Sequence, residues 1–305
     1  MQSYSRDVKA LSVLGVDIGA SNFRVYVERG KDSYARKTKA DFSNPPISIL
    51  RKINSMVGGA KKFDAIGIAV AGFVSSKEGS ILKMPNAGVS NIRISDVLQE
   101  AFRPSKSVKV MNDAVAAVYG EWISTSEKDK DMVYLTFSTG IGGAAILDGK
   151  LVAGKEGNSH EVGHIVIDAE GRVVCGCGGR GHWEAYCSGS GLVSFFRYYA
   201  NKEEELSAET IFSLATSGKM QYKRFLKKAI TMNSAGLASV INVYSPELLV
   251  IGGSVALHNW ENYILPSIEE AKSKVILAMP HVKKSELGDY ASAYGAAKLA
   301  MSSTS

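Results

Sequence analysis

The sequence has few cysteines, few prolines and no long apolar run. Three cysteines among 305 residues are too few for a disulfide scaffold, and this scarcity is typical of a reducing compartment. No stretch approaches the ~20 apolar residues that a membrane helix needs, and residues 1–10 lack the apolar segment of a signal peptide. We therefore expect a cytoplasmic protein that does not associate with membranes.

A block of basic residues is missing as well. The net charge is +6, but the lysines are scattered along the chain. This pattern disfavours nucleic acid as a partner and suits an anionic nucleotide.

Because 45% of the residues are hydrophobic and only seven are proline, the chain can bury a large core. Its length allows two domains.

Two common nucleotide-binding motifs are also absent. The sequence contains no GxxxxGK[ST] loop, and no GxGxxG follows a strand with an acidic residue about 20 positions further on. A nucleotide would therefore have to be held by turns of another kind.

Apolar patterns predict an alternation of strands and helices. The pattern of strand, glycine turn and strand occurs twice, with residues 11–18 and 22–28 in the first hairpin and 132–138 and 143–147 in the second. Further strands are expected over 65–70, 108–111 and 247–251, and helices over 47–56, 114–124, 192–200, 208–243 and 290–301.

The turns of the two hairpins suit phosphate binding. Gly19 and Gly140 carry no Cβ, so phosphate oxygens can approach backbone N–H groups directly. Asp17 lies beside the first turn, and because a bare carboxylate would repel phosphates, we expect it to act through Mg²⁺ or its waters. Either hairpin alone could equally be an ordinary tight turn. The two together favour a nucleotide site.

A glycine-rich loop near the middle of the chain predicts a metal site. Cys175 and Cys177 lie one residue apart, and His164 and His182 flank them. Two thiolates and two imidazoles suit a closed, tetrahedral Zn²⁺ site. The alternative is a loop with two ordinary cysteines, since a CxC pair alone is a weak signal. Cys187, five residues beyond His182, is a rival fourth ligand.

Five short segments then occur in the order and spacing of one family. They are VDIG at 16–19, ND at 112–113, STGIGG at 138–143, EVGH at 161–164, and the cysteine loop ending in Glu184. On these segments the chain resembles, over nearly its whole length, the sugar kinases of the ROK family. The resemblance implies an α/β, two-domain, actin-like (ribonuclease H-like) fold with a cleft between the domains. It places residues 1–113 with 290–305 in a small domain and residues 114–289 in a larger one, with the zinc knuckle at 164–182.

The resemblance also implies a function and a set of site residues. It indicates an ATP-dependent kinase that phosphorylates the 6-hydroxyl of a hexose or an N-acetylhexosamine, with Asp113 as the base that accepts the hydroxyl proton. An Asn-Asp pair before a helix is, on the residues alone, equally a helix N-cap. The implied sugar contacts are Gly72, Asn86, Asn112, Asp113, Glu161, His164 and Glu184. The implied nucleotide contacts are Asp17, Gly19, Ser21, Asn22, Thr139, Gly140, Gly252 and Gly253, of which the last two could be an ordinary helix entry.

The chain departs from the family pattern at a few places. Ala20 and Ser21 replace the Gly and Thr of DxGGT, Val115 stands where an Asn is common, and His182 replaces a third cysteine of the knuckle. His160 replaces a small residue and could line the sugar pocket.

Other functions and substrates remain open at this stage. A catalytically silent sugar-binding module would not need Asp17 and Asp113, and a ROK repressor would need a helix-turn-helix that residues 1–10 cannot form. Glucose, another hexose and N-acetylmannosamine all present a 6-hydroxyl, and Ser159-His160 could mark an altered pocket for the C2 substituent. By resemblance we expect a homodimer or homotetramer.

Overall fold

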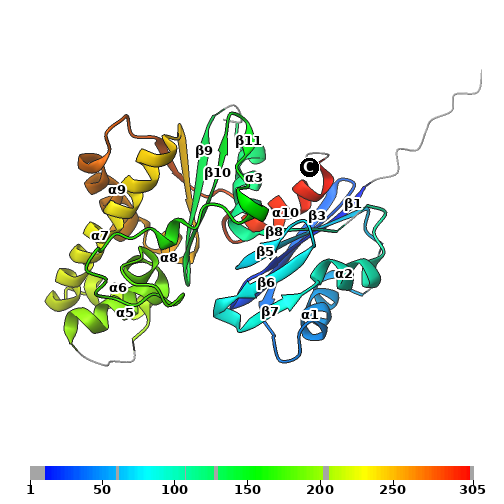
Figure 1. Cartoon of the computed structure of the whole chain (residues 1–305), viewed down its shortest axis with the longest axis horizontal. Coiled ribbons are helices and arrows are strands. Elements are labelled where there is room, and N and C mark those ends of the chain that lie inside the picture. Colours follow the sequence, from blue (N-terminus) through cyan, green and yellow to red (C-terminus); the bar gives the residue numbers. More distant parts are fainter. Residues whose placement is uncertain (1–10, 60–61, 107, 127–129, 202–205, 303–305) are drawn as a thin grey trace, which may run out of the picture. The chain divides into compact units, whose positions relative to one another are not determined.

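The computed structural model of the chain describes residues 11–59, 62–106, 108–126, 130–201 and 206–302 (Figure 1). Residues 1–10, considered above for a signal peptide and a helix-turn-helix, lie outside the described residues. The chain forms two compact units, Met1–Ala116 with Ser292–Ser305, and Ala117–Ala291. The domain limits expected from the sequence stay a prediction.

The first unit is built on a five-stranded mixed sheet. The sheet order is β3-β2-β1-β4-β8, with β1, β2 and β3 antiparallel and β1, β4 and β8 parallel. A separate three-stranded sheet has the order β5-β6-β7. The elements are β1 (Ser12–Ile18), β2 (Asn22–Arg29), β3 (Asp32–Lys39), α1 (Ile47–Val57), β4 (Ala65–Val70), β5 (Phe73–Ser75), β6 (Ser80–Met84), η1 (Pro85–Ala87), β7 (Val89–Ile92), α2 (Ile94–Phe102), β8 (Val108–Asn112) and the C-terminal α10 (Ala291–Met301).

The second unit repeats the same sheet plan. Its order is β11-β10-β9-β12-β13, again with an antiparallel hairpin at the centre and two parallel strands beyond it. The helix α3 (Asp113–Ser124) leads the chain into this unit. The other elements are β9 (Met132–Phe137), β10 (Ile141–Leu147), β11 (Lys150–Leu151), η2 (Lys155–Gly157), η3 (Val162–His164), α4 (Glu184–Cys187), α5 (Gly189–Ala200), α6 (Ala208–Thr216), α7 (Met220–Tyr244), β12 (Leu248–Gly252), α8 (Ser254–His258), the π-helix η4 (Trp260–Ile264), α9 (Leu265–Ala271), η5 (Lys272–Lys274), β13 (His281–Lys284) and η6 (Gly288–Tyr290).

Both predicted hairpins are present, as β1 with β2 and β9 with β10. The second differs in one detail, because β10 begins at Ile141 and not at Gly143. Gly142 and Gly143 pair with Thr136 and Leu135 inside the ladder, and this pairing uses only backbone groups. The turn is therefore shorter than expected and consists of residues 138–140.

Each unit has its own hydrophobic core. In the first, buried side chains of β1 and β4 pack with those of α1 and α2. The C-terminal helix α10 covers part of the same sheet, where Ala297 and Ala300 pack with Val13 and Ala65. Because Gly15 and Gly67 have no side chain, the backbone of α10 can lie directly on β1 and β4.

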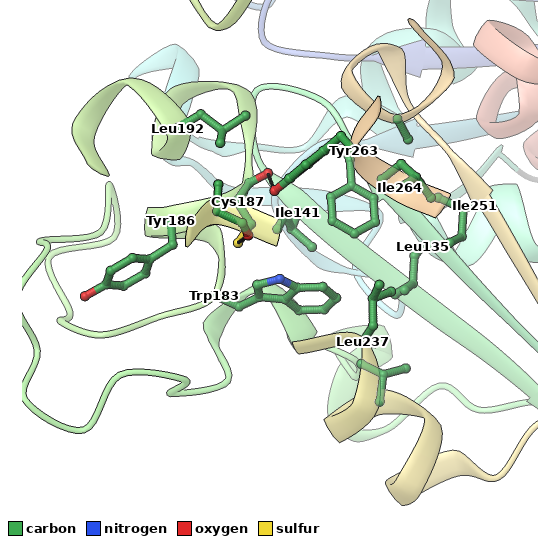
Figure 2. Close-up of a cluster of buried hydrophobic side chains, with 14 of the residues drawn as sticks. Leu135, Ile141, Trp183, Tyr186, Cys187, Leu192, Leu237, Ile251, Tyr263 and Ile264 are labelled. Atoms are coloured by element: carbon green, nitrogen blue, oxygen red, sulfur yellow. Dashed lines mark hydrogen bonds between the residues drawn. The ribbon is translucent and has the colours of Figure 1, made fainter. Parts of the chain in front are cut away.

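The core of the second unit surrounds Trp183, which follows His182 and precedes Glu184. Figure 2 shows Trp183 among the buried side chains of Leu135, Ile141 and Cys187. Trp183 and Cys187 are fully buried.

None of the helices in the described ranges is both long enough and apolar enough to cross a membrane.

Candidate active site and metal centre

The four predicted metal ligands converge in the second unit. One ligand atom from each of His164, Cys175, Cys177 and His182 lies within 4.8 Å of all the others. Cys177 Sγ is 3.3 Å from His182 Nδ1, and Cys175 Sγ is 3.9 Å from His164 Nδ1. The geometry therefore brings together the two thiols and two imidazoles that the sequence predicted, in an arrangement compatible with a tetrahedral ion.

The electrostatics of these groups also fit a cation. Cys175 is 3% exposed, and burial raises the pKa of its thiol to about 12. Burial and the nearby His164 lower the pKa of His182, so that its imidazole is neutral and can act as a ligand. A buried thiolate needs a positive charge beside it, and a bound Zn²⁺ ion would supply that charge.

Cys187, the rival ligand, lies elsewhere. It is buried in the hydrophobic core of the second unit, and its thiol donates toward the carbonyl of Ala229 at 3.8 Å. Cys187 is not part of the four-residue cluster. Among the described residues, the structure therefore favours His182 as the fourth ligand.

Two carboxylates border the metal cluster. Glu161 Oε2 is 3.6 Å from His164 Nε2, the ring nitrogen that is turned away from Cys175. Glu184 Oε1 is 3.7 Å from Cys175 Sγ. Partial burial raises the pKa of Glu161, the imidazole of His164 opposes this shift, and the Glu184 carboxylate adds to it. Glu161, His164 and Glu184, the predicted sugar contacts of this unit, thus lie around one cluster.

A buried series of hydrogen bonds anchors the segment that contains these residues. Trp183 Nε1 donates to Asn233 Oδ1 at 2.9 Å, and Asn233 Nδ2 donates to Ser267 Oγ at 3.0 Å. Asn233 and Ser267 are fully buried. Since Trp183 lies between His182 and Glu184 in the sequence, these hydrogen bonds hold a metal ligand and a carboxylate in place at the same time. The sequence does not reveal them, because a lone Asn in the middle of α7 gives no signal of a partner.

A second anchor lies at the base of the cysteine loop. Asp168 is 4% exposed and accepts hydrogen bonds from the Arg172 guanidinium and from the Tyr186 hydroxyl. The Tyr186 hydroxyl also accepts from the amide of Val173 at 3.0 Å. These bonds, led by those from Arg172, hold the pKa of Asp168 well below its usual range. The loop is thus tied to α4 at a point outside the metal cluster.

In the first unit, Asn112 and Asp113 lie where β8 ends and α3 begins. Asn112 Oδ1 accepts from the amides of Ala114 at 2.9 Å and Val115 at 3.3 Å, so Asn112 caps the helix. Its amide group donates to the carbonyl of Gly72 at 3.3 Å. The capping alternative therefore applies to Asn112. The catalytic role of Asp113 stays a prediction.

The glycine turn of each hairpin leaves backbone donors available. In the described part of the chain, the amide groups of Ala20 and Ser21 in the first turn donate to no protein acceptor. The same holds, within the described residues, for the amides of Thr139 and Gly140 in the second turn. Such donors are what a phosphate needs.

The remaining nucleotide-side residues have additional partners. Asp17 is buried, and Arg24 Nη1 donates to its Oδ2 at 3.0 Å. Gly253 has a φ of 87°, and a Cβ there would overlap the backbone of Phe137. The glycine at position 253 therefore has a packing reason that does not depend on a nucleotide. The neighbouring amide of Ser254 donates to Ser138 Oγ at 3.4 Å, which places this turn beside the turn of residues 138–140.

Two other predicted contacts differ in how free they are. Asn86 lies exposed in the short helix η1, where its side chain is accessible. His160, in contrast, uses both ring nitrogens within the protein. Its Nε2 donates to the carbonyl of Val152 at 2.6 Å, and its Nδ1 accepts from the Tyr244 hydroxyl at 2.7 Å. Burial lowers the pKa of His160, which agrees with a neutral ring held by the fold.

Comparison with known proteins identifies the family. Residues 13–303 match the pattern described as the ROK family. The chain belongs to the ROK family. It is 36% identical over 287 residues to a glucokinase from Pyrobaculum calidifontis, and the match covers 94% of both chains.

Two solved ROK structures share the fold. A ROK hexokinase from Thermus thermophilus superposes with a TM-score of 0.80 at 27% identity, covering 95% of this chain and 98% of the other. A ROK glucokinase from Streptomyces griseus, solved in complex with glucose and AMPPNP, has a TM-score of 0.77 at 26% identity, covering 95% of this chain and 99% of the other. These matches confirm the actin-like fold class predicted from the sequence.

The metal cluster leads to a first prediction, which concerns the zinc content of the purified protein. Purified protein should contain Zn²⁺ in a 1:1 ratio to the chain, and Cys175→Ser should lose most of it, because a hydroxyl is a poor ligand for Zn²⁺. Elemental analysis of both proteins measures this. Cys187→Ala is the matched control, since it removes a thiol outside the cluster and should keep its zinc. Full zinc occupancy in Cys175→Ser would exclude the proposed ligand set.

The Asp168 anchor leads to a second prediction. Because the pKa of Asp168 is lowered in the folded protein, its ionised form contributes stability that is fully present above the unfolded pKa of about 4. This contribution is lost progressively as the pH falls from there toward the lower pKa of the folded state, so part of it is already lost at pH 3. Arg172 is 48% exposed, so solvent screens the contribution of its ion pair with Asp168 to the stability. We expect Asp168→Asn to lower the free energy of unfolding by about 1–2 kcal/mol at pH 7.

Denaturant unfolding at pH 7 and pH 3 tests this prediction. The difference between wild type and Asp168→Asn should shrink at the lower pH. Glu170→Gln is the control, because Glu170 pairs with the same Arg172 from an exposed position and should have little effect. An equal difference at both pH values would show that Asp168 does not act through its charge.

Proposed function

We propose that the protein is an ATP-dependent glucokinase that transfers the γ-phosphate of ATP to the 6-hydroxyl of glucose. The observation that supports this most directly is the orientation of His164. Its Nδ1 faces the metal cluster, and its Nε2 faces Glu161, whose pKa is raised by the nearby carboxylate of Glu184 in addition to burial. Polar groups held rigidly in this way can discriminate among sugars, because a wrong sugar leaves them without hydrogen bonds. The glucokinase from P. calidifontis and the glucose complex from S. griseus give the same indication.

The ligand set fits a structural zinc ion. Two thiolates and two neutral imidazoles leave no open position for water or substrate. When bound, Zn²⁺ would neutralise the two thiolates and fix the tautomer of His164 with Nε2 directed away from the metal. Glu161, His164 and Glu184 then hydrogen-bond sugar hydroxyls. In the first unit we assign sugar contacts to Gly72, Asn86 and Asn112.

Asp113 is the general base in this proposal. Its carboxylate lies at the junction of a strand and a helix, where the backbone is rigid, and it accepts the proton of the attacking hydroxyl late in a loose transition state. Positioning and charge stabilisation supply most of the acceleration in phosphoryl transfer. The cap formed by Asn112 supports this role, because it fixes the start of α3 next to Asp113.

The two hairpin turns hold the nucleotide phosphates through backbone amides. We assign Ser21 and Asn22 in one turn and Thr139 and Gly140 in the other to these contacts. Gly19 lets a phosphate approach the first turn closely, while its own amide donates to the carbonyl of Asn22 at 3.1 Å. Asp17 would hold Mg²⁺, directly or through water, while Arg24 balances part of its charge. Gly252 and Gly253 remain candidates for contacts to the nucleoside, since the following Ser254 bonds to Ser138.

The structure gives no support to N-acetylmannosamine as the preferred sugar. The sequence-based argument for it was an altered C2 pocket formed by Ser159 and His160. Both side chains instead bond to the same carbonyl, that of Val152, with Ser159 Oγ at 2.7 Å and His160 Nε2 at 2.6 Å. His160 therefore has no ring nitrogen left to contact a substrate.

A steady-state screen tests the proposal. ATP-dependent phosphorylation of glucose, mannose, N-acetylglucosamine and N-acetylmannosamine is measured, and the product is identified as the 6-phosphate by ³¹P NMR. We expect the highest kcat/KM for glucose. A higher value for N-acetylmannosamine would overturn the substrate assignment, and the absence of phosphorylation of every sugar would favour a silent sugar-binding module or a regulator.

A further inference from the structure

The carboxylate of Glu184 contacts more than the metal cluster. Its Oε2 accepts a hydrogen bond from the amide of Ile141 at 2.8 Å, while its Oε1 is the oxygen directed toward Cys175. Ile141 is the first residue of β10 and directly follows the turn of residues 138–140. One oxygen of a sugar-side carboxylate is thus bound to the backbone at the end of a phosphate-side turn.

Close packing reinforces this contact. A Cβ on Gly140 would overlap Glu184 Oε2, so a side chain at position 140 would displace this carboxylate from its present place. A Cβ on Gly163, in the segment EVGH, would overlap the carbonyl oxygen of Ile141. The backbone of Ile141 is therefore contacted at its amide by Glu184 and at its carbonyl by Gly163. Both sugar-side motifs of the second unit meet the end of the turn at this single residue.

The segment that follows Glu184 supports the rest of the turn. The amide of Gly189 donates to the carbonyl of Ser138 at 2.8 Å, and Ser190 Oγ donates to the carbonyl of Thr139 at 2.7 Å. These bonds use the carbonyl groups of the turn and leave the amides of Thr139 and Gly140 for a ligand. The position of the amides therefore depends on α4 and the start of α5, and Glu184 is the first residue of α4.

We propose that Glu184 is a positioning residue for the phosphate turn as well as a sugar contact, and that it couples the affinity for sugar to the affinity for nucleotide. The inference rests on the proposed function. A sugar hydroxyl that donates to Oε1 restricts the rotation of the carboxylate and thereby strengthens the bond from Oε2 to the Ile141 amide. The turn is then ordered before the nucleotide arrives. Because coupling between two ligands is reciprocal, bound nucleotide must raise sugar affinity by the same factor.

The test uses the full chain and a matched pair of glutamates. Calorimetry measures the Kd of AMPPNP without sugar, and the Kd of glucose with and without AMPPNP. Glu184→Ala removes the acceptor for the Ile141 amide, and Glu184→Gln retains a neutral acceptor. Glu161→Ala is the control, because Glu161 is a sugar-side carboxylate with no recorded hydrogen bond to the turn among the described residues. Hydrogen exchange of residues 138–143 reports on the turn without any ligand.

We expect Glu184→Ala to raise the Kd of AMPPNP in sugar-free protein at least about fivefold, as fits the loss of one charge-assisted hydrogen bond. Hydrogen exchange of the amides of residues 138–143 should accelerate. The coupling factor, which is the ratio of the glucose Kd without AMPPNP to that with AMPPNP, should fall toward one. Glu184→Gln should show effects between those of the wild type and of Glu184→Ala. Glu161→Ala should weaken glucose binding only.

The proposal is overturned if Glu184→Ala leaves both AMPPNP affinity and exchange at the wild-type level, because Glu184 is then only a sugar contact. Equal effects in Glu161→Ala would also overturn it, since they would indicate a general loss of structure. If Glu184→Ala does not fold, Glu184→Gln provides the comparison, with a smaller expected loss of AMPPNP affinity because a neutral acceptor remains; wild-type affinity and exchange in that variant would then overturn the proposal. A protein that binds AMPPNP but phosphorylates no sugar would refute the proposed function, whereas the exchange and AMPPNP measurements would still decide the role of Glu184 at the turn.

Discussion

Asp113→Asn is expected to lower the turnover of sugar phosphorylation at least ~10²-fold while leaving the Kd of glucose and of AMPPNP nearly unchanged. A general base acts mainly in the transition state, so its loss appears in kcat and not in ground-state affinity. The fold should tolerate the change. Asn112, and not Asp113, caps the helix through two amides, and an Asn at 113 can still accept the bond that Asp113 Oδ1 takes from the amide of Ala114.

Asp96→Asn is the matched control for this experiment. Asp96 also lies in the first turn of a helix of the first unit, but its side chain is exposed and pairs with Arg93. Its turnover should equal that of the wild type. Retention of more than about a tenth of wild-type turnover in Asp113→Asn would exclude Asp113 as the base, since a general base contributes at least ~10²-fold.

The elements that the sequence predicted well are those whose residues have a strong local signal. The hairpin strands are apolar or alternating and end at glycine, and each was found within about two residues of its expected limits. The strands β3, β5, β6, β7, β11 and β13 were missed. For β3 and β13 the reason is that DSYARKTK and HVKK are polar segments at the edge of a sheet. Only their pairing with a neighbour makes them strands, and pairing partners are not encoded locally.

The metal cluster was predictable for a similar reason. Cysteine and histidine are few in this chain, so four of them in a short segment form a signal that needs no tertiary information. Trp183, Asn233 and Ser267 form an anchor that depends on three separate segments, and none of the three residues is unusual in its own segment. The ligands are therefore recognisable in the sequence, and the residues that hold them in place are not.

Arg24 is an intermediate case. The hairpin was predicted, and its register pairs Asp17 with Arg24 across the two strands. Counting outward from the turn would have placed the guanidinium beside the carboxylate. The expectation that Asp17 acts through Mg²⁺ left out the Arg24 guanidinium, whose Nη1 lies 3.0 Å from Asp17 Oδ2.

Removal of zinc is expected to weaken glucose binding about tenfold and to leave AMPPNP binding within about twofold of the native value. The metal orients His164, so its loss should remove one hydrogen bond in a buried polar site, which corresponds to a change of this size. Glu184 has other supports. Its backbone neighbour Trp183 is bonded to Asn233, and its Oε2 is bonded to the Ile141 amide, so the turn of residues 138–140 should keep its position.

Calorimetric titration of both ligands into chelator-treated protein that remains folded by circular dichroism measures the effect. Cys187→Ala treated in the same way is the control, and added zinc should restore glucose affinity. Loss of both affinities together would mean that the metal supports the whole second unit, including the turn. If neither affinity changed, the sugar would have to bind away from His164, since nothing near the cluster would then respond to the metal that orients it.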